Sequence, residues 1–318
     1  VVDALTLWGM APRARRLFSY WLRHFVLDDG NINYYGTSLS EYGQLLTTAR
    51  RLMARGTKRD WLVQHEPYLS RLACHLQGCL RETGRAQLVA GVPEADERKA
   101  TATYFHNNAW MARGLRDWAY LLHLYLKRPK EAGSFRRDAG SLRRALNNAT
   151  EATWRGDPGD WWLSPMVEPV PRPEGRISAS RIGSYANYRY WPELLSSGML
   201  RKELMRALVK ARLMGGGQFL GMTRFMDHLD DWPLMDYLEG LWKLGLRDDY
   251  RLSLWGHICY HQAHGHLTAY EQVTLPPGRK VADYCLPCQL VAVRAAHRLA
   301  IKLSVTIIRV HSMSIRAN

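Results

Sequence analysis

The chain lacks several features that would assign it to a common class of protein. It has 5 cysteines in 318 residues, and this sparse, odd set argues against a disulfide scaffold. No apolar run reaches the length of a membrane span. No signal peptide is present, but the chain begins Val-Val-Asp without Met and could be a fragment. The sequence therefore leaves a periplasmic or extracellular location open.

Acidic residues are scarce relative to basic ones. The chain carries 44 Lys and Arg against 29 Asp and Glu, and it has no acid from Tyr284 to Asn318. A net charge of +15 is typical of proteins that bind nucleic acid or anionic surfaces. However, the basic residues stand mostly singly or in pairs, without a run of five or more like charges, which indicates solvated helix surfaces. We therefore expect no nucleic-acid partner and no membrane partner.

Phenylalanine is also scarce, with 6 residues against 12 Trp and 16 Tyr. Indole and phenol rings combine a flat apolar face with a polar edge. Such rings suit the packing of large helices, and they equally suit contact with the face of a sugar.

Apolar residues recur with a helical period almost throughout the chain. Leu62, Leu69, Leu72 and Leu76 make one such face, and further helices are predicted at about 131–154, 198–213, 232–246, 248–263 and 285–303. We find no convincing set of alternating strands, although Val305–Val310 is a candidate strand. Short and long loops alternate, which is typical of helical hairpins whose long loops gather on one face.

The stretch from Gly215 to Tyr284 is densest in carboxylates and imidazoles. Asp231-Trp232-Pro233 fits a helix cap followed by Pro in the first turn, which leaves Asp227 and Asp230 in a loop. The Asp227-x-x-Asp230-Asp231 spacing also occurs in magnesium-binding isoprenoid enzymes, but their companion elements are not evident. This stretch therefore predicts one wall of a polar pocket.

Three histidines of that stretch, His257, His261 and His264, share one helix face and could bind zinc. The chain has no H-E-x-x-H motif, and Cys285-x-x-Cys288 lacks a partner pair. We therefore expect the histidines to line the pocket or bond to loops, and we expect no metal and no cofactor.

Two upstream segments carry similar side chains. Glu94 and Asp96 lie in an acidic turn before a helix that opens with His106, Asn107 and Asn108. The acids could merely favour the helix N-terminus. In the second segment, Asp160-Trp161-Trp162 suits a sugar subsite, and it equally suits a turn with core tryptophans.

Together these segments resemble bacterial six-hairpin glycosidase-like proteins of the (α/α)6 toroid type. The resemblance covers about residues 1–300, rests on the acidic turn at Glu94, on His106-Asn107-Asn108, on 184–188, on Asp230-Asp231-Trp232-Pro233 and on 268–272, and fixes no single family. It implies an all-α toroid of helical hairpins with acids on the long-loop face. Because a complete toroid has twelve helices and about ten are predicted, we expect a chain truncated at the C-terminus. Residues 1–300 would then be an incomplete catalytic-type domain, and 301–318 an irregular tail of native or non-native origin.

The resemblance implies a glycoside hydrolase with a carbohydrate substrate, although a truncated chain need not be active. Glycosidic cleavage needs one protonated and one ionised carboxyl group. We predict Glu271 and Asp230 as the catalytic pair, with Glu94 and Asp96 next, and we expect Glu94, Asp160, Asp230 and Glu271 to converge on one concave mouth. The predicted substrate-binding residues are His106, Asn107, Trp110, Asp160, Trp161, Trp162, Tyr188, Arg189, Asp227, His257, His261 and Tyr270.

Two alternatives stay open from the sequence. A toroidal polysaccharide lyase would use His261 or Tyr270 as a base, with Arg189 neutralising a uronate. A non-catalytic helical scaffold or sugar-binding remnant would need none of these chemical roles.

Overall fold

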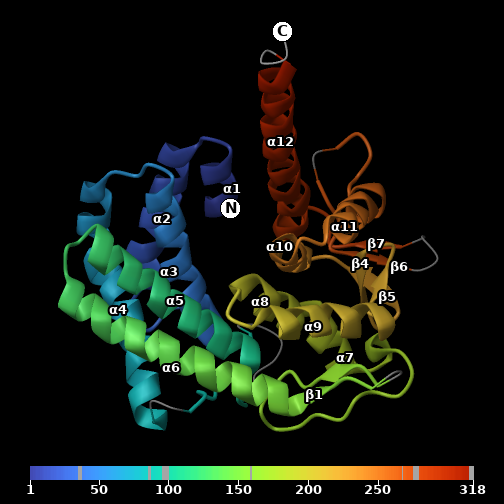
Figure 1. The fold of residues 1–318 in the computed structure, drawn as a ribbon, viewed down its shortest axis with the longest axis horizontal. Coiled ribbons are helices and arrows are strands. Elements are labelled where there is room, and N and C mark those ends of the chain that lie inside the picture. Colours follow the sequence, from blue (N-terminus) through green and yellow to red (C-terminus); the bar gives the residue numbers. More distant parts are fainter. Residues whose placement is uncertain are drawn as a thin grey trace.

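A computed structural model describes residues 1–34, 38–84, 87–94, 100–157, 160–266, 268–274 and 279–314, with side chains described as far as residue 300. The protein is mostly helical, with its first six helices on one side of the molecule and the later helices and strands on the other (Figure 1). Among these described residues, no helix is long and apolar enough to cross a membrane.

Helices account for most of the described chain. They are α1 (Val2–Leu7), α2 (Ala11–Phe25), α3 (Leu39–Ala54), α4 (Arg59–Thr83), α5 (Phe105–Leu124), α6 (Pro129–Thr153), α7 (Arg181–Tyr185), α8 (Trp191–Ser197), α9 (Lys202–Met214), α10 (Leu234–Leu244), α11 (Arg247–Tyr260) and α12 (Leu286–Ser314). Local signals set several ends: Ser38 and Glu41 form a capping box at α3, and Gly198 and Gly245 end α8 and α10 in the left-handed conformation.

Six of these helices contact one another in a closed circuit. Helix α3 packs on α5, α5 on α8, α8 on α10, α10 on α12, α12 on α1, and α1 on α3. Helices α2, α4, α6, α9 and α11 each pack against members of this circuit. The closest approach in it uses glycine, because a Cβ on Gly43 of α3 would lie 2.0 Å from the carbonyl oxygen of Trp110 in α5.

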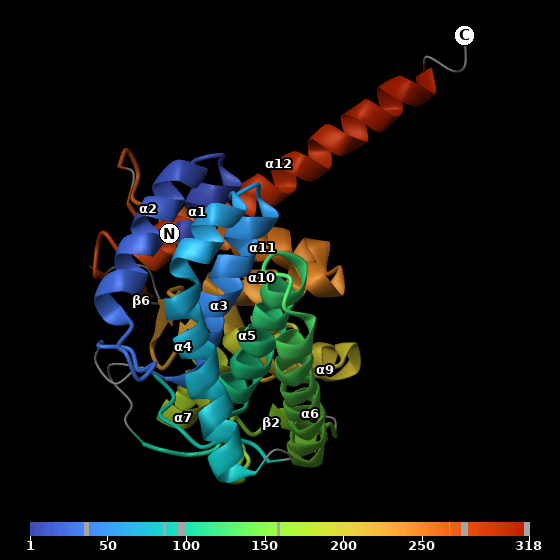
Figure 2. The same ribbon diagram turned by 90° about the vertical axis from the view of Figure 1, so that its left-hand side faces the viewer.

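The C-terminal part of the chain differs from the sequence predictions. The tail expected to be irregular after residue 300 and the strand expected at Val305–Val310 are both part of α12, which continues to Ser314 and projects from the body (Figure 2). No Gly or Pro follows Pro287, so nothing in the sequence interrupts this helix. The described residues also give no support to the expected truncation, because α12 already contacts α1.

A small antiparallel sheet was missed from the sequence. It contains, in spatial order, β3 (Gln218–Phe219), β4 (Met222–Phe225), β5 (His228–Asp230), β6 (Gln272–Thr274) and β7 (Lys280–Val281), and β1 (Trp154–Arg155) pairs separately with β2 (Trp162–Leu163). Strands of two to four residues are too short to show a period-2 pattern. In the register of β5 and β6, Asp230 lies opposite Gln272, so Asp230 and Glu271 come close together.

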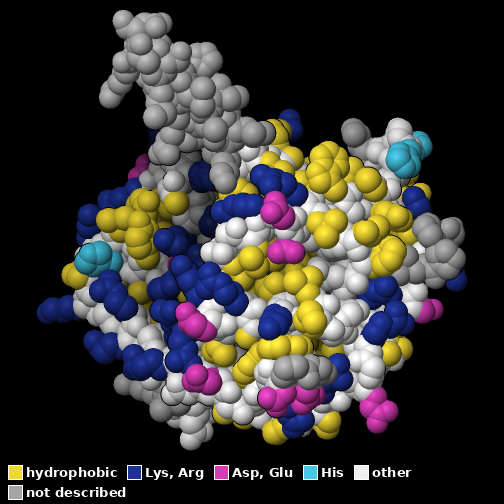
Figure 3. Space-filling view, turned by 45° about the vertical axis from the view of Figure 1, so that its right-hand side comes forward, with side chains coloured by type: hydrophobic (Ala, Val, Ile, Leu, Met, Phe, Trp, Pro, Cys, Tyr) yellow, Lys and Arg dark blue, Asp and Glu magenta, His cyan; other side chains and the backbone are white. Residues whose placement is uncertain are grey.

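One face carries a concentration of Lys and Arg side chains on one flank, with Asp and Glu side chains among them (Figure 3).

Candidate active site

A cavity of about 180 Å³ brings together three of the acids that the sequence predicted. Its lining residues are Glu94, Tyr185, Tyr188, Arg189, Phe225, Asp230, Trp232, Glu271 and Gln272. Glu94, Asp230 and Glu271 come from three separate segments, and Asp160, the fourth acid expected at this mouth, is not among the lining residues. The fold thus assembles carboxyl groups, aromatic rings and one guanidinium around a single space.

Asp230 is a buried acid at the end of a strand. It ends β5, is 3% exposed, and accepts a hydrogen bond of 3.1 Å from the backbone N–H of Trp232. The Gln272 amide approaches its other oxygen at 3.4 Å. Burial, and next the neighbouring Glu271 carboxylate, raise the pKa of Asp230 well above its usual value. This environment therefore favours the protonated form of Asp230.

Two backbone hydrogen bonds, one through its N–H and one through its carbonyl, hold Glu271 in place. Its N–H donates to the carbonyl of Ala282 at 3.1 Å, and its carbonyl accepts from the N–H of Asp231 at 3.3 Å. The first bond joins the start of β6 to the residue after β7, and the second joins it to the residue after β5. They place a second carboxyl group beside Asp230 at the cavity.

Arg189 is surrounded by carboxylates. It donates to Glu94 at 2.9 Å and to Glu193 at 2.8 Å, with Glu41 at 3.7 Å. Burial alone lowers the pKa of Arg189, but Glu193 and Glu94 outweigh burial and raise it. The guanidinium also lies 5.4 Å from the centre of the Trp232 ring. Arg189 therefore fixes Glu94 at the cavity and already has its charge balanced.

Helix α5 holds the segment that carries Glu94. His106 Nε2 lies 3.0 Å from the Pro93 carbonyl, and the Asn107 amide donates to the Val92 carbonyl at 2.8 Å. Asn108 accepts from the Val89 N–H at 2.8 Å and donates to the Val89 carbonyl at 2.9 Å. Burial lowers the pKa of His106 to about 3, so the ring is neutral.

Three of the predicted substrate contacts lie away from this cavity. His106, Asn107 and Trp110 are buried in α5 and are not among the residues that line the cavity. Trp110 instead borders a different cavity of about 490 Å³, which is lined by residues of α1, α2, α3, α5, α8, α10 and α12. The His106 and Asn107 side chains bond to the carbonyls of residues 93 and 92, because buried backbone carbonyls need hydrogen-bond donors.

Four other predicted residues also lie away from the cavity lining. Trp162 is 1% exposed and donates to the Val170 carbonyl at 2.8 Å, so it packs in the core. Trp161 lies under the Lys210 ammonium at 3.8 Å, and Asp160 lies 3.8 Å from Arg172. The Asp227 side chain is 93% exposed and contacts His228. Asp96 lies outside the described residues.

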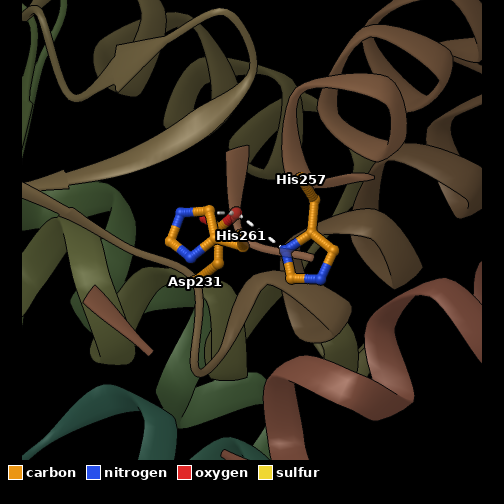
Figure 4. Close-up of side chains that lie close together, drawn as sticks. All are labelled: Asp231, His257 and His261. Atoms are coloured by element: carbon orange, nitrogen blue, oxygen red, sulfur yellow. Dashed lines mark hydrogen bonds and ion pairs between the residues drawn. The ribbon is translucent and has the colours of Figure 1, made fainter. Parts of the chain in front are cut away.

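Asp231, the residue after Asp230, lies in a buried cluster with His257 and His261 (Figure 4). One of its oxygens accepts from the Thr223 N–H at 2.9 Å, and the other lies 3.0 Å from His257 Nδ1 and 3.4 Å from His261 Nε2. The predicted cap role of Asp231 is wrong, because α10 begins at Leu234 and the Asp231 carboxylate faces α11 instead. Burial alone raises the pKa of Asp231, but His261 and His257 outweigh burial and lower it.

The two histidines join this cluster to neighbouring elements. His257 Nε2 lies 2.9 Å from the Cys288 carbonyl in α12, and His261 Nδ1 lies 2.9 Å from the Tyr270 carbonyl. Their ligand atoms and that of Asp231 lie within 4.8 Å of one another, which makes them the described residues that could hold a metal. His261 Nδ1 donates to the Tyr270 carbonyl, since a carbonyl can only accept. The cluster can therefore also act, without an ion, as a support for the turn that carries Asp230.

Several cavity residues were not singled out from the sequence. Tyr185, Phe225, Trp232 and Gln272 line the space, and Trp232 and Gln272 directly follow predicted acidic positions. Tyr188, which was predicted, also lines it, and burial, with Asp230 and Glu271, raises its pKa well above the usual value. Tyr270, His257 and His261 do not line it.

Comparison with known proteins finds similarity in structure only. No family model matches the chain, and no curated protein matches its sequence. A glutamate-to-alanine variant of a glycosidase in complex with glucose aligns over 94% of this chain and 85% of its own, with 12% identity and a TM-score of 0.64. A rhamnosidase from Klebsiella oxytoca with rhamnose bound aligns over 82% of this chain and 46% of its own, with 15% identity and a TM-score of 0.54.

A third similar structure has no stated activity. It is an uncharacterized conserved protein from Thermus thermophilus, with 12% identity, a TM-score of 0.58, and coverage of 92% of this chain and 91% of its own. At sequence identities this low, structural similarity shows a shared fold and does not show a shared activity. Over most of its length, this chain shares the fold of the glycosidases, as its sequence resemblance predicted, without assignment to one family.

Proposed function

We propose that this protein is a glycoside hydrolase in which Asp230 and Glu271 form the catalytic carboxyl pair. The observation that carries the proposal is the cavity in which Asp230, with its pKa raised by burial, lies beside Glu271. Two carboxyl groups in opposite protonation states are what acid–base cleavage of a glycosidic bond requires.

In the proposed reaction, Asp230 donates its proton to the glycosidic oxygen as the bond to the anomeric carbon breaks. Glu271, as the ionised partner, takes a proton from the attacking water or attacks the anomeric carbon itself. Glu94, held by Arg189 at 2.9 Å, is the third acid at the cavity and stabilises positive charge that develops on the sugar ring. Tyr188 and Trp232 provide the aromatic contacts to the sugar.

The proposed substrate is a terminal sugar unit of an oligosaccharide or polysaccharide. A cavity of about 180 Å³ is smaller than the roughly 300–1,000 Å³ typical of sites for drug-sized ligands. The similar structures contain glucose in one case and rhamnose in another. Glucosides and rhamnosides are therefore the first substrates to test.

We further infer that the closed circuit of α1, α3, α5, α8, α10 and α12 is the inner ring of an (α/α)6-type toroid. Residues 1–300 remain the proposed catalytic-type domain. The segments that carry Glu94, Asp230 and Glu271 lie between helices, which is where such a toroid carries its site.

The experiment is hydrolysis of 4-nitrophenyl glucosides and rhamnosides of both anomeric configurations. Asp230→Asn and Glu271→Gln should each lower kcat by on the order of 10²–10⁴-fold. Asp227→Asn, at a neighbouring exposed acid, is the matched control and should leave kcat unchanged. Undiminished hydrolysis by both cavity variants would refute the pair.

The lyase alternative receives less support. It needs Arg189 to neutralise a uronate, but the guanidinium is already bonded to Glu94 and Glu193. An unsaturated product that absorbs ultraviolet light would reveal a lyase in the same assay.

A further inference from the structure

Two cysteines lie at the start of α12, one helical turn apart, in the sequence Cys285-Leu286-Pro287-Cys288. Cys285 directly precedes the helix; its N–H donates to the Ala269 carbonyl at 3.1 Å, and its carbonyl accepts from the Gln289 N–H at 3.0 Å. Pro287 fits the first turn, where its missing N–H has no intrahelical partner. Residues three apart at the start of a helix have neighbouring side chains, which is the spacing of Cys-x-x-Cys dithiol motifs.

The two thiols have different surroundings. Cys288 is fully buried, whereas Cys285 is 9% exposed, and both pack with Ala269 against Trp232 of the cavity. The neighbouring Cys288 thiol and backbone N–H lower the pKa of Cys285 against the effect of burial. One sulfur is therefore the more accessible and more acidic, and the other is enclosed beside it, as in known dithiol sites.

Cys285 also contacts the proposed catalytic machinery directly. Its thiol donates a hydrogen bond to the Glu271 carboxylate. A hydrogen bond to a carboxylate favours the ionised form that the proposed reaction requires of Glu271. The chemical state of Cys285 thus acts on the proposed catalytic carboxylate, Glu271, without touching a substrate.

We propose that Cys285 and Cys288 are a redox-active dithiol that closes to a disulfide and thereby lowers the activity of the adjacent Glu271. The regulatory half of this proposal rests on the proposed hydrolase function, whereas disulfide formation does not. In the structure all five cysteines are free thiols, which corresponds to the reduced, active form.

The oxidant is a low-molecular-weight disulfide. The Cys285 thiolate attacks one of its sulfurs, forms a mixed disulfide and releases one thiolate. The Cys288 thiolate then attacks the Cys285 sulfur, forms the Cys285–Cys288 bond and releases the second thiolate. Two protein thiols are oxidised, one small disulfide is reduced to two thiols, and the protons that the cysteines lose pass to the released thiolates.

Closure removes the only hydrogen that Cys285 Sγ can donate to Glu271. Loss of this hydrogen bond should raise the pKa of Glu271, so kcat should fall roughly 10-fold at pH values below the raised pKa. Because the ionised form of Glu271 loses a donor, the acid limb of the pH–rate profile should move to higher pH, and KM should change little.

The experiment treats the reduced, full-length protein with oxidised glutathione, alkylates the remaining thiols with iodoacetamide and maps them by mass spectrometry. The expected result is a Cys285–Cys288 disulfide, with the exposed Cys74 and Cys259 alkylated or glutathionylated. Hydrolysis of the best 4-nitrophenyl glycoside is measured before oxidation, after oxidation and after reduction with dithiothreitol. Activity should fall on oxidation and return on reduction.

Three variants separate the possible results. Cys288→Ser should be active when reduced, should stop at a Cys285–glutathione mixed disulfide on oxidation, and should regain activity with dithiothreitol. Cys285→Ala should be slow in both states with the shifted pH profile, and Cys259→Ser should behave as the wild type. Failure of the 285–288 disulfide to form overturns the proposal, and so does a disulfide that leaves kcat and the pH profile unchanged. Absence of turnover with every glycoside would count against the hydrolase function instead, and the thiol map would still decide whether the dithiol exists.

Discussion

Replacing Arg189 by Met tests whether the buried charge network at the cavity is built as described. Arg189 is 7% exposed, and it donates to Glu94 and Glu193, which are 3% and 2% exposed. Removing one partner of a buried ion pair typically costs about 3–5 kcal/mol, because the remaining charge is left unpaired. Two carboxylates lose their partner here, but burial already raises the pKa of Glu193, so Glu193 can take up a proton. We therefore expect a loss of about 4 kcal/mol in the free energy of unfolding.

Urea unfolding measures this loss as a lower midpoint with an unchanged slope. The deficit should shrink as the pH is lowered from 8 to 5, since the orphaned carboxylates then become protonated. Adding Glu193→Gln to the variant should recover part of the loss. Arg128→Met is the control, because the Arg128 side chain is 47% exposed in its pair with Glu66, and such pairs contribute about 0–1 kcal/mol. Equal, small losses in the two single variants would show that Arg189 is not holding buried charge.

Three further predictions concern stability. Because the pKa of Asp230 is raised in the folded protein, Asp230 contributes stability below its unfolded pKa of about 4, and this stability is lost as the pH rises. The Asp230→Asn variant should therefore melt at a higher temperature than the wild type at about pH 7–8, and at the same temperature near pH 4. Asn108→Ala should cost roughly 2–4 kcal/mol in urea unfolding, because the buried N–H and carbonyl of Val89 lose their partner. The variant should also have a lower kcat, because the segment that carries Glu94 loosens. An unchanged kcat would show that the loss of stability does not reach Glu94. Gly43→Ala should cost about 3 kcal/mol, since its Cβ would meet the Trp110 carbonyl at 2.0 Å, and a neutral result would contradict this close helix crossing.

The helical content was predictable because helices carry a long, repeated signal. The faces built on Leu62, Leu69, Leu72 and Leu76 are buried as expected, and the helix predicted at 131–154 is α6, Pro129–Thr153. The small sheet was not predictable from periodicity, because its strands are two to four residues long. That sheet nevertheless places Asp230 and Glu271 side by side.

The candidate site was predictable in part. Glu94, Asp230, Glu271, Tyr188 and Arg189 do meet at one cavity. The prediction failed for residues whose local sequence suits two environments, such as the amides and imidazole at the start of α5, which bond to buried loop carbonyls. Local sequence could not reveal those acceptors, because they lie 13–15 residues earlier in the chain.

By itself, the sequence determined that the chain is mostly helical, that its loops alternate in length, and that carboxylates and aromatic rings collect on the longer ones. Only the tertiary structure decided which of them meet. Trp162 and Trp232 both follow aspartates closely, yet Trp162 is buried in the core while Trp232 lines the cavity. Likewise, Asp230 and Asp231 are adjacent, but the first faces the cavity and the second faces two histidines. The physical reason is that burial and pKa depend on neighbours brought together by long-range packing, which no local pattern of residues encodes.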